Sequence, residues 1–307
     1  MNRWSIDQIP SQLGKVAIVT GANSGIGYEV TLGLVKKDVE VIMACRNMQK
    51  AEEAKAKILH VCPKAKINPM KVDISSLNEV KKFADQFQRN YQKLNFLINN
   101  AGIMMSPYKV TEDSFENQFA TNYVGHFALT GLLLPMLTSS LGSRLVTLSS
   151  LSYKWSEIQF DDFHASKGYS KTKAYGQSKR ACLMFAFELQ RRLSAAGYDT
   201  LSVAAHPGLA KTNLDQYYPF LIRPLGSFFL QPAAKGALPI LYAALDKNLK
   251  GGEFIGPDGF QQMRGNPIRV DADGYSNNKK VAERLWSESE KMTNVFYLTK
   301  SNPNNEI

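Results

Sequence analysis

A tyrosine and a lysine four residues apart, Tyr175 and Lys179, are the pair of side chains best suited to catalysis in this sequence. On a helix, residues spaced i, i+4 share one face, so the lysine ammonium would lie beside the phenol. A nearby positive charge favours the phenolate and is expected to lower the tyrosine pKa from its usual value of ~10. Such a phenol can give or take a proton near neutral pH, as the interconversion of a carbonyl and an alcohol requires.

Spacing alone does not identify the pair, because Tyr169 and Tyr275 also precede a lysine by four residues. Tyr169 lies in lysine-rich, loop-like sequence, and Tyr275 lies in Asn-rich sequence after the last strand that can be recognised. Tyr175 is predicted to open a long amphipathic helix, 175–195, between two strands. This context favours Tyr175 as the functional residue.

A glycine-rich turn, 20–27, follows the apolar run 16–19 and precedes a helix-like pattern. Gly21 would let the chain turn sharply, Gly25 would let the backbone approach a phosphate, and Gly27 would let the helix pack closely. A strand, such a turn and a helix together bind the pyrophosphate of a dinucleotide at the helix N-terminus. The spacing is one residue looser than the usual fingerprint, and an ordinary turn is the alternative, but the order of elements favours the nucleotide.

Strand-like and helix-like runs alternate along the chain. The predicted strands span 16–20, 40–44, 65–71, 96–99, 144–148, 201–205 and 252–255. The predicted helices span 25–36, 48–60, 77–89, 112–137, 175–195 and 233–246. This alternation implies right-handed crossovers and a doubly wound parallel sheet with helices on both faces, a Rossmann fold, in a single domain. Residues 1–13 and 260–307 would then be terminal extensions, and 209–232 a substrate lid.

The composition of the 307 residues is that of a globular protein, with 44% hydrophobic and 21% charged residues. The net charge of +10 comes from lysines scattered over helical segments, so we expect no nucleic-acid site. Cys45, Cys62 and Cys182 lack metal-ligand spacing, which predicts no metal site and a reducing, cytoplasmic setting. No signal peptide or integral membrane segment is expected.

The second predicted strand ends in Cys45 and Arg46 and carries no acid at the position where an NAD site places its carboxylate. Arg46 offers a planar fork of donors that suits a ribose 2′-phosphate. A solvent-facing arginine is the simpler alternative. The missing carboxylate nevertheless makes NADP the expected cofactor and NAD the less favoured one.

Several motifs follow one another in the order found in one family: the glycine-rich turn 20–27, Val72-Asp73-Ile74, 99–102 (Asn-Asn-Ala-Gly), Asn122, the strand 144–150 that ends in Ser150, Tyr175 with Lys179, and His206-Pro207-Gly208 with Thr212. The chain therefore resembles a short-chain dehydrogenase/reductase of the retinol-dehydrogenase-like and protochlorophyllide-reductase-like branch. The resemblance covers about residues 14 to 260. It implies a catalytic set of Asn122, Ser150, Tyr175 and Lys179. It also implies cofactor contacts at Gly21, Asn23, Ser24, Gly25, Ile26, Gly27, Arg46, Asp73, Ile74, Asn100, Ala101, Gly102, Tyr175, Lys179, Pro207, Gly208 and Thr212.

The resemblance implies that NADPH delivers hydride to a carbonyl carbon while Tyr175 protonates the oxygen. Ser150 would hydrogen-bond that oxygen, although Ser149 could take its place, and Lys179 would bind the nicotinamide ribose. Asn122 would hold a water that links Lys179 to solvent. The alternative function is a non-catalytic redox sensor or scaffold that binds a dinucleotide.

Two departures from the family affect the substrate side. An insert at about 153–171 carries Trp155, Phe160 and Phe163 and is expected to form a flap near the substrate. The hydrophobic N-terminal anchor frequent in this branch is missing, so membrane residence is not carried over. Apolar residues within 209–232 suggest an apolar carbonyl or alcohol as substrate; a core, dimer or membrane-surface contact is the alternative. A homodimer is possible from the resemblance.

Overall fold

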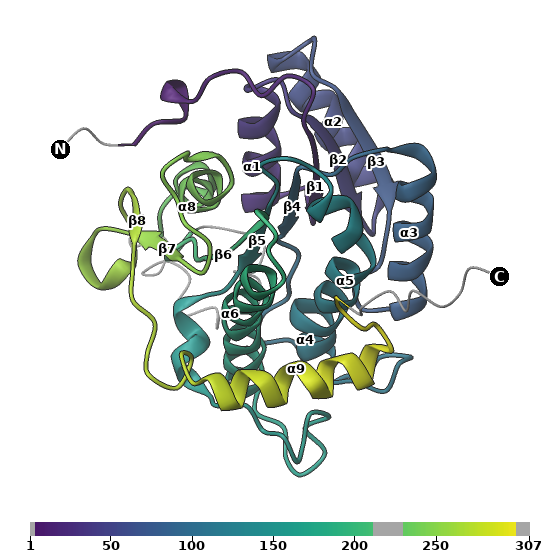
Figure 1. Ribbon diagram of the computed structural model, residues 1–307, viewed down its shortest axis with the longest axis vertical. Coiled ribbons are helices and arrows are strands. Elements are labelled where there is room, and N and C mark those ends of the chain that lie inside the picture. The colour runs from purple at the N-terminus through teal and green to yellow at the C-terminus, as the bar shows by residue number, and fades with distance from the viewer. Residues whose placement is uncertain (1–3, 211–229, 299–307) are drawn as a thin grey trace.

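The computed structural model describes residues 4–210 and 230–298. Within these ranges one eight-stranded sheet has the order β3-β2-β1-β4-β5-β6-β7-β8 (Figure 1). Its strands are β1 (Val16–Thr20), β2 (Glu40–Cys45), β3 (Ile67–Lys71), β4 (Phe96–Asn99), β5 (Arg144–Leu148), β6 (Leu201–Ala205), β7 (Phe254–Pro257) and β8 (Pro267–Arg269). Strands β1 to β7 run parallel, and β8 pairs antiparallel with β7. The predicted doubly wound sheet is confirmed, and its strand order reverses between β1 and β4.

Residue types explain which strands are central and which lie at the edges. Every residue of β1 is buried, as expected for a run of apolar residues covered on both faces. The edge strand β3 buries only Ile67 and Met70 and contains Pro69, which cannot donate a ladder hydrogen bond. The opposite edge strand, β8, begins with Pro267.

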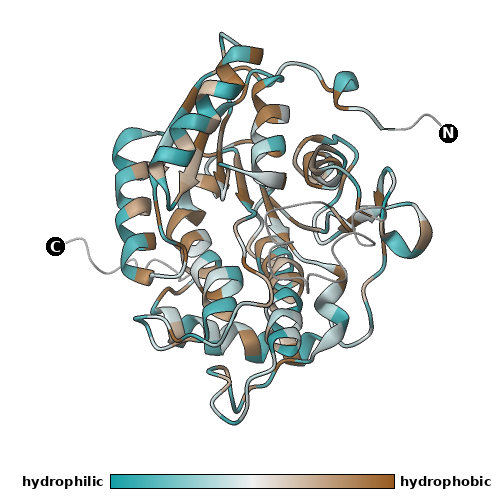
Figure 2. Ribbon diagram, turned by 180° about the vertical axis from the view of Figure 1, so that it is seen from behind, coloured by the Kyte–Doolittle hydropathy of each residue, from teal (hydrophilic) through white to brown (hydrophobic). Residues whose placement is uncertain are grey.

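Helices cover both faces of the sheet. One layer consists of α1 (Gly25–Val35), α2 (Met48–Val61) and α8 (Ala233–Leu245). The other consists of α3 (Leu77–Asn90), α4 (Asn117–Phe119), α5 (Gly125–Thr138) and α6 (Lys171–Ala195), with α9 (Lys279–Thr293) packed across α5 and α6. Figure 2 shows that the outer sides of α2 and α3 are hydrophilic and that the strands between these two helices are more hydrophobic. No helix within the described ranges is both long and apolar enough to cross a membrane.

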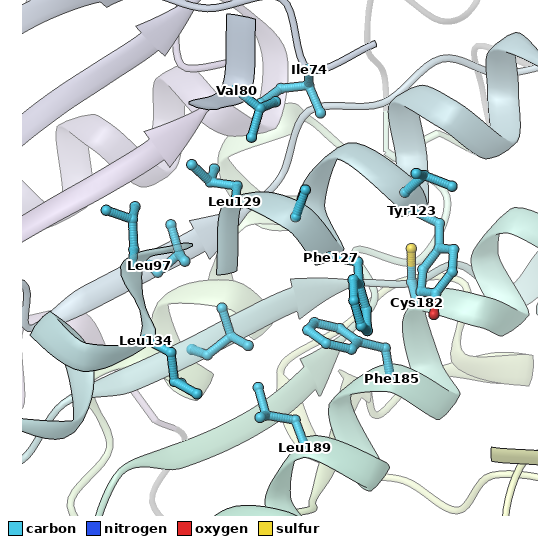
Figure 3. Close-up of a cluster of buried hydrophobic side chains, with 14 of the residues drawn as sticks. Ile74, Val80, Leu97, Tyr123, Phe127, Leu129, Leu134, Cys182, Phe185 and Leu189 are labelled. Carbon is cyan, nitrogen blue, oxygen red and sulfur yellow. The ribbon is translucent and has the colours of Figure 1, made fainter. Parts of the chain in front are cut away.

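The larger core cluster lies between the sheet and the layer of α3, α5 and α6. Figure 3 shows Phe127 and Phe185 pointing toward each other in this cluster, with Leu129 and Leu134 nearby. The ring centroids of Phe127 and Phe185 are 5.4 Å apart, and Trp286 of α9 packs edge-on to Phe127 at 5.2 Å. Burying each such side chain contributes roughly 1.5–3 kcal/mol, so α9 is an integral part of this core.

The N-terminal segment also packs against the domain. A second cluster of buried apolar residues lies between the sheet and the layer that contains α1 and α8. Trp4, Ile6 and Ile9 are partly buried and pack against this cluster. The rings of Trp4 and Tyr242 of α8 meet edge-on with centroids 5.4 Å apart. The part of the predicted N-terminal extension that is described therefore covers apolar surface.

Several predicted boundaries were wrong. Helix α6 begins at Lys171 rather than Tyr175, because the Ser170 side chain caps it by accepting a hydrogen bond from Lys173 N. The helix predicted for 112–137 begins only at Asn117, where Glu116 caps it, and it passes through the π-helical turn Ala120–Val124 before α5. Strand β3 begins at residue 67 rather than at the predicted residue 65, and β7 spans 254–257 rather than the predicted 252–255. Neither β8 nor α9 was predicted.

Candidate active site

The glycine-rich turn after β1 has the geometry of a phosphate cradle. Gly21 and Gly25 have φ of 66° and 54°, a region that disfavours other residues. A Cβ on Gly27 would lie 2.3 Å from the carbonyl oxygen of Gly21, so only glycine allows α1 to start this close to the turn. The side chain of Ser24, the residue that precedes α1, makes no capping hydrogen bond, which leaves the first N–H groups of the helix available to an anion.

The segment after β4 is attached to this turn through one hydroxyl group. Thr20 Oγ1 accepts hydrogen bonds from the backbone N–H groups of Asn100 and Ala101, each at 2.9 Å, and Asn100 Nδ2 donates to Thr20 O at 2.7 Å. A Cβ on Gly102 would lie 3.1 Å from Asn122 Oδ1 and 3.5 Å from Lys179 Nζ. The predicted cofactor residues 100–102 therefore join the glycine-rich turn to the catalytic side chains.

The predicted adenosine end brings Arg46 and Asp73 together. Arg46 Nη1 lies 3.6 Å from Asp73 Oδ2, and the two side chains are 75% and 31% exposed. Burial by itself would raise the pKa of Asp73, but hydrogen bonds from Ser75 and the charge of Arg46 outweigh it, so the pKa is lowered. The side chain of Ile74 instead packs in the core, so this residue can offer a cofactor only its backbone (Figure 3).

Three of the predicted catalytic side chains, Ser150, Tyr175 and Lys179, lie where β5 meets α6. Ser150 follows the end of β5 and precedes the 3-10 helix η3 (Leu151–Trp155), and its side chain lies close enough to Tyr175 to lower the pKa of that phenol. Lys179 Nζ lies 5.9 Å from the centre of the Tyr175 ring and donates to Leu148 O at 3.1 Å. Ser149 is buried and its Oγ already donates to the backbone oxygen of Lys179, whereas the side chain of Ser150 lies beside Tyr175.

The predicted lowering of the Tyr175 pKa was wrong. Burial raises the pKa of Tyr175 to about 12, and the hydrogen bond with Ser150 opposes that rise only in part. Burial also lowers the pKa of Lys179. Tyr175 is therefore held in its neutral, proton-donating form, the form needed to protonate a carbonyl oxygen.

Asn122 sits in the π-helical turn, and its side chain is held by two neighbours. Asn122 Nδ2 donates to Ile103 O at 3.0 Å and to Ser178 Oγ at 2.9 Å, while Oδ1 accepts from Ile103 N at 2.8 Å. Among the partners described, this leaves one acceptor position on Oδ1, close to Gly102 and Lys179. A π-helical turn is a frequent feature of functional sites.

Two buried residues that were not predicted as part of the site, His126 and Cys182, hold the backbone of Asn122. Cys182 Sγ donates to Asn122 O at 3.1 Å, and His126 Nδ1 lies 3.0 Å from the same oxygen. His126 Nε2 lies 2.9 Å from Thr20 Oγ1. Because a carbonyl oxygen can only accept, the proton of neutral His126 is on Nδ1, and Nε2 is an acceptor that faces the Thr20 hydroxyl, which also lies 3.3 Å from Ile98 O. Burial lowers the pKa of His126 to about 4, which keeps the ring neutral.

The segment after β6 is held by the connection between β7 and β8. Gly208 has φ of 67°, and a Cβ there would lie 2.3 Å from Met263 O. His206 Nε2 lies 3.0 Å from Gln262 Oε1. Pro207 and Gly208 are thus fixed near the end of β6. Thr212 and nearly all of the predicted lid, 209–232, lie outside the described residues.

The aromatic residues of the insert do not act as one flap. Phe163 stacks on Phe119 of α4 with ring centroids 5.3 Å apart and packs in the core, and Phe160 packs edge-on to Phe163. Only Trp155 approaches the site, with its ring 6.3 Å from that of Tyr175. A groove of about 650 Å³ lies between the insert and the start of α6, and its lining includes neither Tyr175 nor Ser150.

The other two Tyr-x-x-x-Lys patterns have structural roles. Tyr169 OH donates to Ser106 O and accepts from Gln118 Nε2, each at 2.7 Å. Tyr275 OH accepts from Ile158 N at 3.2 Å. Neither tyrosine belongs to the cluster of Ser150, Tyr175 and Lys179.

Comparisons with known proteins agree with this geometry. The family model described as short chain dehydrogenase matches residues 15–219. Retinol dehydrogenase 12 of Mus musculus is 38% identical over 92% of this chain and 86% of its own length. Short-chain dehydrogenase TIC 32 B, chloroplastic, of Brassica napus is 40% identical over 76% of this chain and 77% of its own length.

Solved structures show the same fold. A crystal structure of a protein from Mycobacterium paratuberculosis is 36% identical, with a TM-score of 0.82 over 97% of this chain and 100% of that one. A short chain dehydrogenase from Shigella flexneri, complexed with NADP, has a TM-score of 0.63 at 22% identity over 79% of this chain and 96% of that one, and it supports the fold alone. The chain therefore belongs to the short-chain dehydrogenase/reductase family, in its retinol-dehydrogenase-like branch, and is an oxidoreductase of alcohols and carbonyls that binds a nicotinamide dinucleotide.

Proposed function

We propose that this protein is an NADP(H)-dependent reductase of apolar carbonyl compounds, with Tyr175 as the general acid and base. The observation that carries the proposal is the convergence of Ser150, Tyr175 and Lys179 beside Gly102 and Asn122. In an open α/β sheet, ligands bind outside the carboxyl ends of the strands near the point where the strand order reverses. The four catalytic candidates and the glycine-rich turn all lie at that edge.

The residues present fit a dinucleotide. The uncapped N-terminus of α1 and the two left-handed glycines would hold the pyrophosphate, with Asn23, Ser24 and Ile26 in the same turn. Asn100, Ala101 and Gly102 would line the path toward the nicotinamide, and Pro207 and Gly208 would contact its ring. The cofactor contact of Thr212 remains a prediction from the sequence.

The preference for NADP rests on Arg46. Its exposed guanidinium stands at the end of β2, where a ribose 2′-phosphate could pair with it more strongly than Asp73 does at 3.6 Å. Asp73 would then be free to contact the adenine. No carboxylate follows β2 to receive a ribose 2′-hydroxyl, which disfavours NAD.

The chemistry follows from the protonation states of the site. When bound, the reduced nicotinamide supplies hydride to the carbonyl carbon. Tyr175, neutral because of its burial, donates its proton to the carbonyl oxygen, and the hydroxyl of Ser150 hydrogen-bonds that oxygen as negative charge develops on it. Lys179 would stabilise the resulting phenolate and would hold the ribose of the bound cofactor. The Tyr175 phenolate would regain its proton from Lys179. Lys179 would in turn be reprotonated through a water held between its Nζ and the remaining acceptor position of Asn122 Oδ1.

The substrate class rests on two indications. Several relatives are named retinol dehydrogenases, and the predicted lid is rich in apolar residues. Both favour an apolar aldehyde, ketone or alcohol.

The test is turnover by the purified chain with NADPH or NADH across a panel of aldehydes and ketones of increasing chain length, followed by cofactor absorbance. We expect NADPH-dependent reduction whose kcat/KM rises with the apolar area of the substrate. Dinucleotide binding without turnover of any carbonyl or alcohol would instead support the sensor or scaffold. Equal use of NADPH and NADH would refute the role given to Arg46.

A further inference from the structure

Helix α6 presents two i, i+4 pairs that are offset by one residue. Tyr175 and Lys179 face the site, and Gly176 and Arg180 lie about 100° further round the helix. A Cβ on Gly176 would lie 2.9 Å from both the carbonyl oxygen of Ser152 and the Cβ of Trp155. The 3-10 helix η3 therefore rests directly on the backbone of α6 at this glycine.

Arg180, one helical turn after Gly176, also holds η3 against α6. Its side chain is 4% exposed, and its Nε donates to Ser156 O at 2.6 Å, at the end of η3. Its Nη1 donates to both carboxylate oxygens of Asp273, at 2.8 and 3.0 Å, and to Ser276 Oγ at 2.8 Å. The guanidinium also lies over the ring of Tyr153, with its central carbon 5.4 Å from the ring centroid.

Asp273 and Ser276 belong to the stretch between β8 and α9, which runs beside α6 (Figure 1). A buried guanidinium needs a charged partner, and loss of one partner from such a pair is costly. The C-terminal segment thus supplies the counter-charge for a residue that follows the catalytic lysine directly in the sequence.

Ser150 moves with η3 because it caps that helix. Its Oγ accepts from Ser152 N at 3.2 Å, and its carbonyl oxygen accepts from Tyr153 N at 2.9 Å. Any shift of η3 relative to α6 therefore changes the position of the Ser150 hydroxyl relative to Tyr175. Displacement of a catalytic group by about 1 Å can lower a rate by about 100-fold.

We propose that the Arg180–Asp273 pair is a clamp that positions Ser150 against Tyr175, and that residues 273–276 of the C-terminal segment are needed for full activity for this reason. Arg180 and Asp273 are positioning residues that act through η3 and do not touch the substrate. The proposal rests on the proposed function, because Ser150 and Tyr175 are taken as catalytic. It goes beyond the proposed function because it makes activity depend on Arg180 and Asp273, which lie outside the proposed catalytic set.

The test compares Asp273→Asn with wild type in steady-state kinetics and in hydrogen exchange of the η3 amides. We expect kcat to fall at least about tenfold while KM for NADPH stays the same, because the glycine-rich turn is not part of the clamp. The pH midpoint for alcohol oxidation should move upward, as it should in Ser150→Ala. In a Ser150→Ala background, Asp273→Asn should have almost no further effect on kcat. Exchange of the amides of residues 152 and 153 should become faster.

A matched control is Glu288→Gln, which removes a carboxylate from an exposed ion pair with Lys291 on α9 and should change none of these values. Unchanged kcat in Asp273→Asn, or an equal loss of kcat with and without Ser150, would overturn the clamp. Hydrogen exchange does not require turnover. If the wild-type protein reduced no carbonyl but Asp273→Asn still made exchange at η3 faster, the clamp would be supported and the proposed function would be refuted. Exchange and kcat that both match wild type would refute the clamp alone.

Discussion

Replacing His126 with asparagine should change how the stability of the protein depends on pH. His126 is neutral in the folded protein because burial lowers its pKa to about 4, whereas an unfolded histidine titrates at about 6.5. Between these values the unfolded state binds more protons than the folded state. The contribution of His126 to the free energy of unfolding is therefore fully present above about pH 6.5 and is lost progressively as the pH falls toward 4.

The size of the effect follows from the two pKa values. A pH of about 5 lies about 1.5 units below the pKa of the unfolded imidazole, while the folded imidazole is still mostly neutral. At about 1.4 kcal/mol per unit, protonation of the unfolded state then favours unfolding by about 2 kcal/mol. His206 is also buried, and its pKa is also lowered to about 4, so wild type should lose about 4 kcal/mol from the two residues. His126→Asn should lose about 2 kcal/mol less than wild type between about pH 7 and pH 5.

The assay is urea-induced unfolding followed by tryptophan fluorescence at the two pH values, for wild type, His126→Asn and a control, His60→Asn, at an exposed position on α2. Each protein is compared with itself, so the constant cost of lost hydrogen bonds to Thr20 and Asn122 cancels. An identical pH dependence for wild type and His126→Asn would refute the neutral ring and the hydrogen-bond chain built on it.

Further changes test other parts of the site. Arg46→Ala should raise KM for NADPH about 10- to 100-fold and leave KM for NADH unchanged, because the lost pair involves only the 2′-phosphate; a parallel change for both cofactors in steady-state kinetics would contradict this. Ser150→Ala should move the pH midpoint of alcohol oxidation upward, since the hydrogen bond from Ser150 lowers the pKa of Tyr175; a downward shift would refute that interaction. Trp286→Ala should lower the free energy of unfolding by about 3–5 kcal/mol in urea denaturation while leaving kcat unchanged; a small loss would mean that α9 is not part of the core.

Most of the sheet could be predicted because its central strands are continuous apolar runs between helix patterns. The bounds of β1, β4, β5 and β6 match the predictions. Strand β8 could not be found, because three residues that include Pro267 and Arg269 carry no strand periodicity. Helix α9 could have been found: Ala282, Leu285, Trp286 and Ser289 are buried at helical spacing after the capping residue Asn278.

The site residues could be chosen from the sequence, but their environment could not. The spacing of Tyr175 and Lys179 correctly placed them on one helix, yet the sign of the tyrosine pKa shift was wrong because burial raises this pKa by more than Ser150 lowers it. The π-helical turn around Asn122 and the histidine behind it depend on contacts more than one hundred residues apart, such as that between Thr20 and His126. Such contacts leave no local pattern.

The most direct test of the central claim is the rate of carbonyl reduction by Tyr175→Phe, measured at saturating NADPH beside Tyr169→Phe. The two variants remove the same hydroxyl group from tyrosines that both stand four residues before a lysine, but only Tyr175 lies with Ser150 and Lys179. We expect kcat to fall by about 100-fold or more for Tyr175→Phe and to stay within a few-fold of wild type for Tyr169→Phe. Turnover of Tyr175→Phe at the wild-type rate would contradict the account.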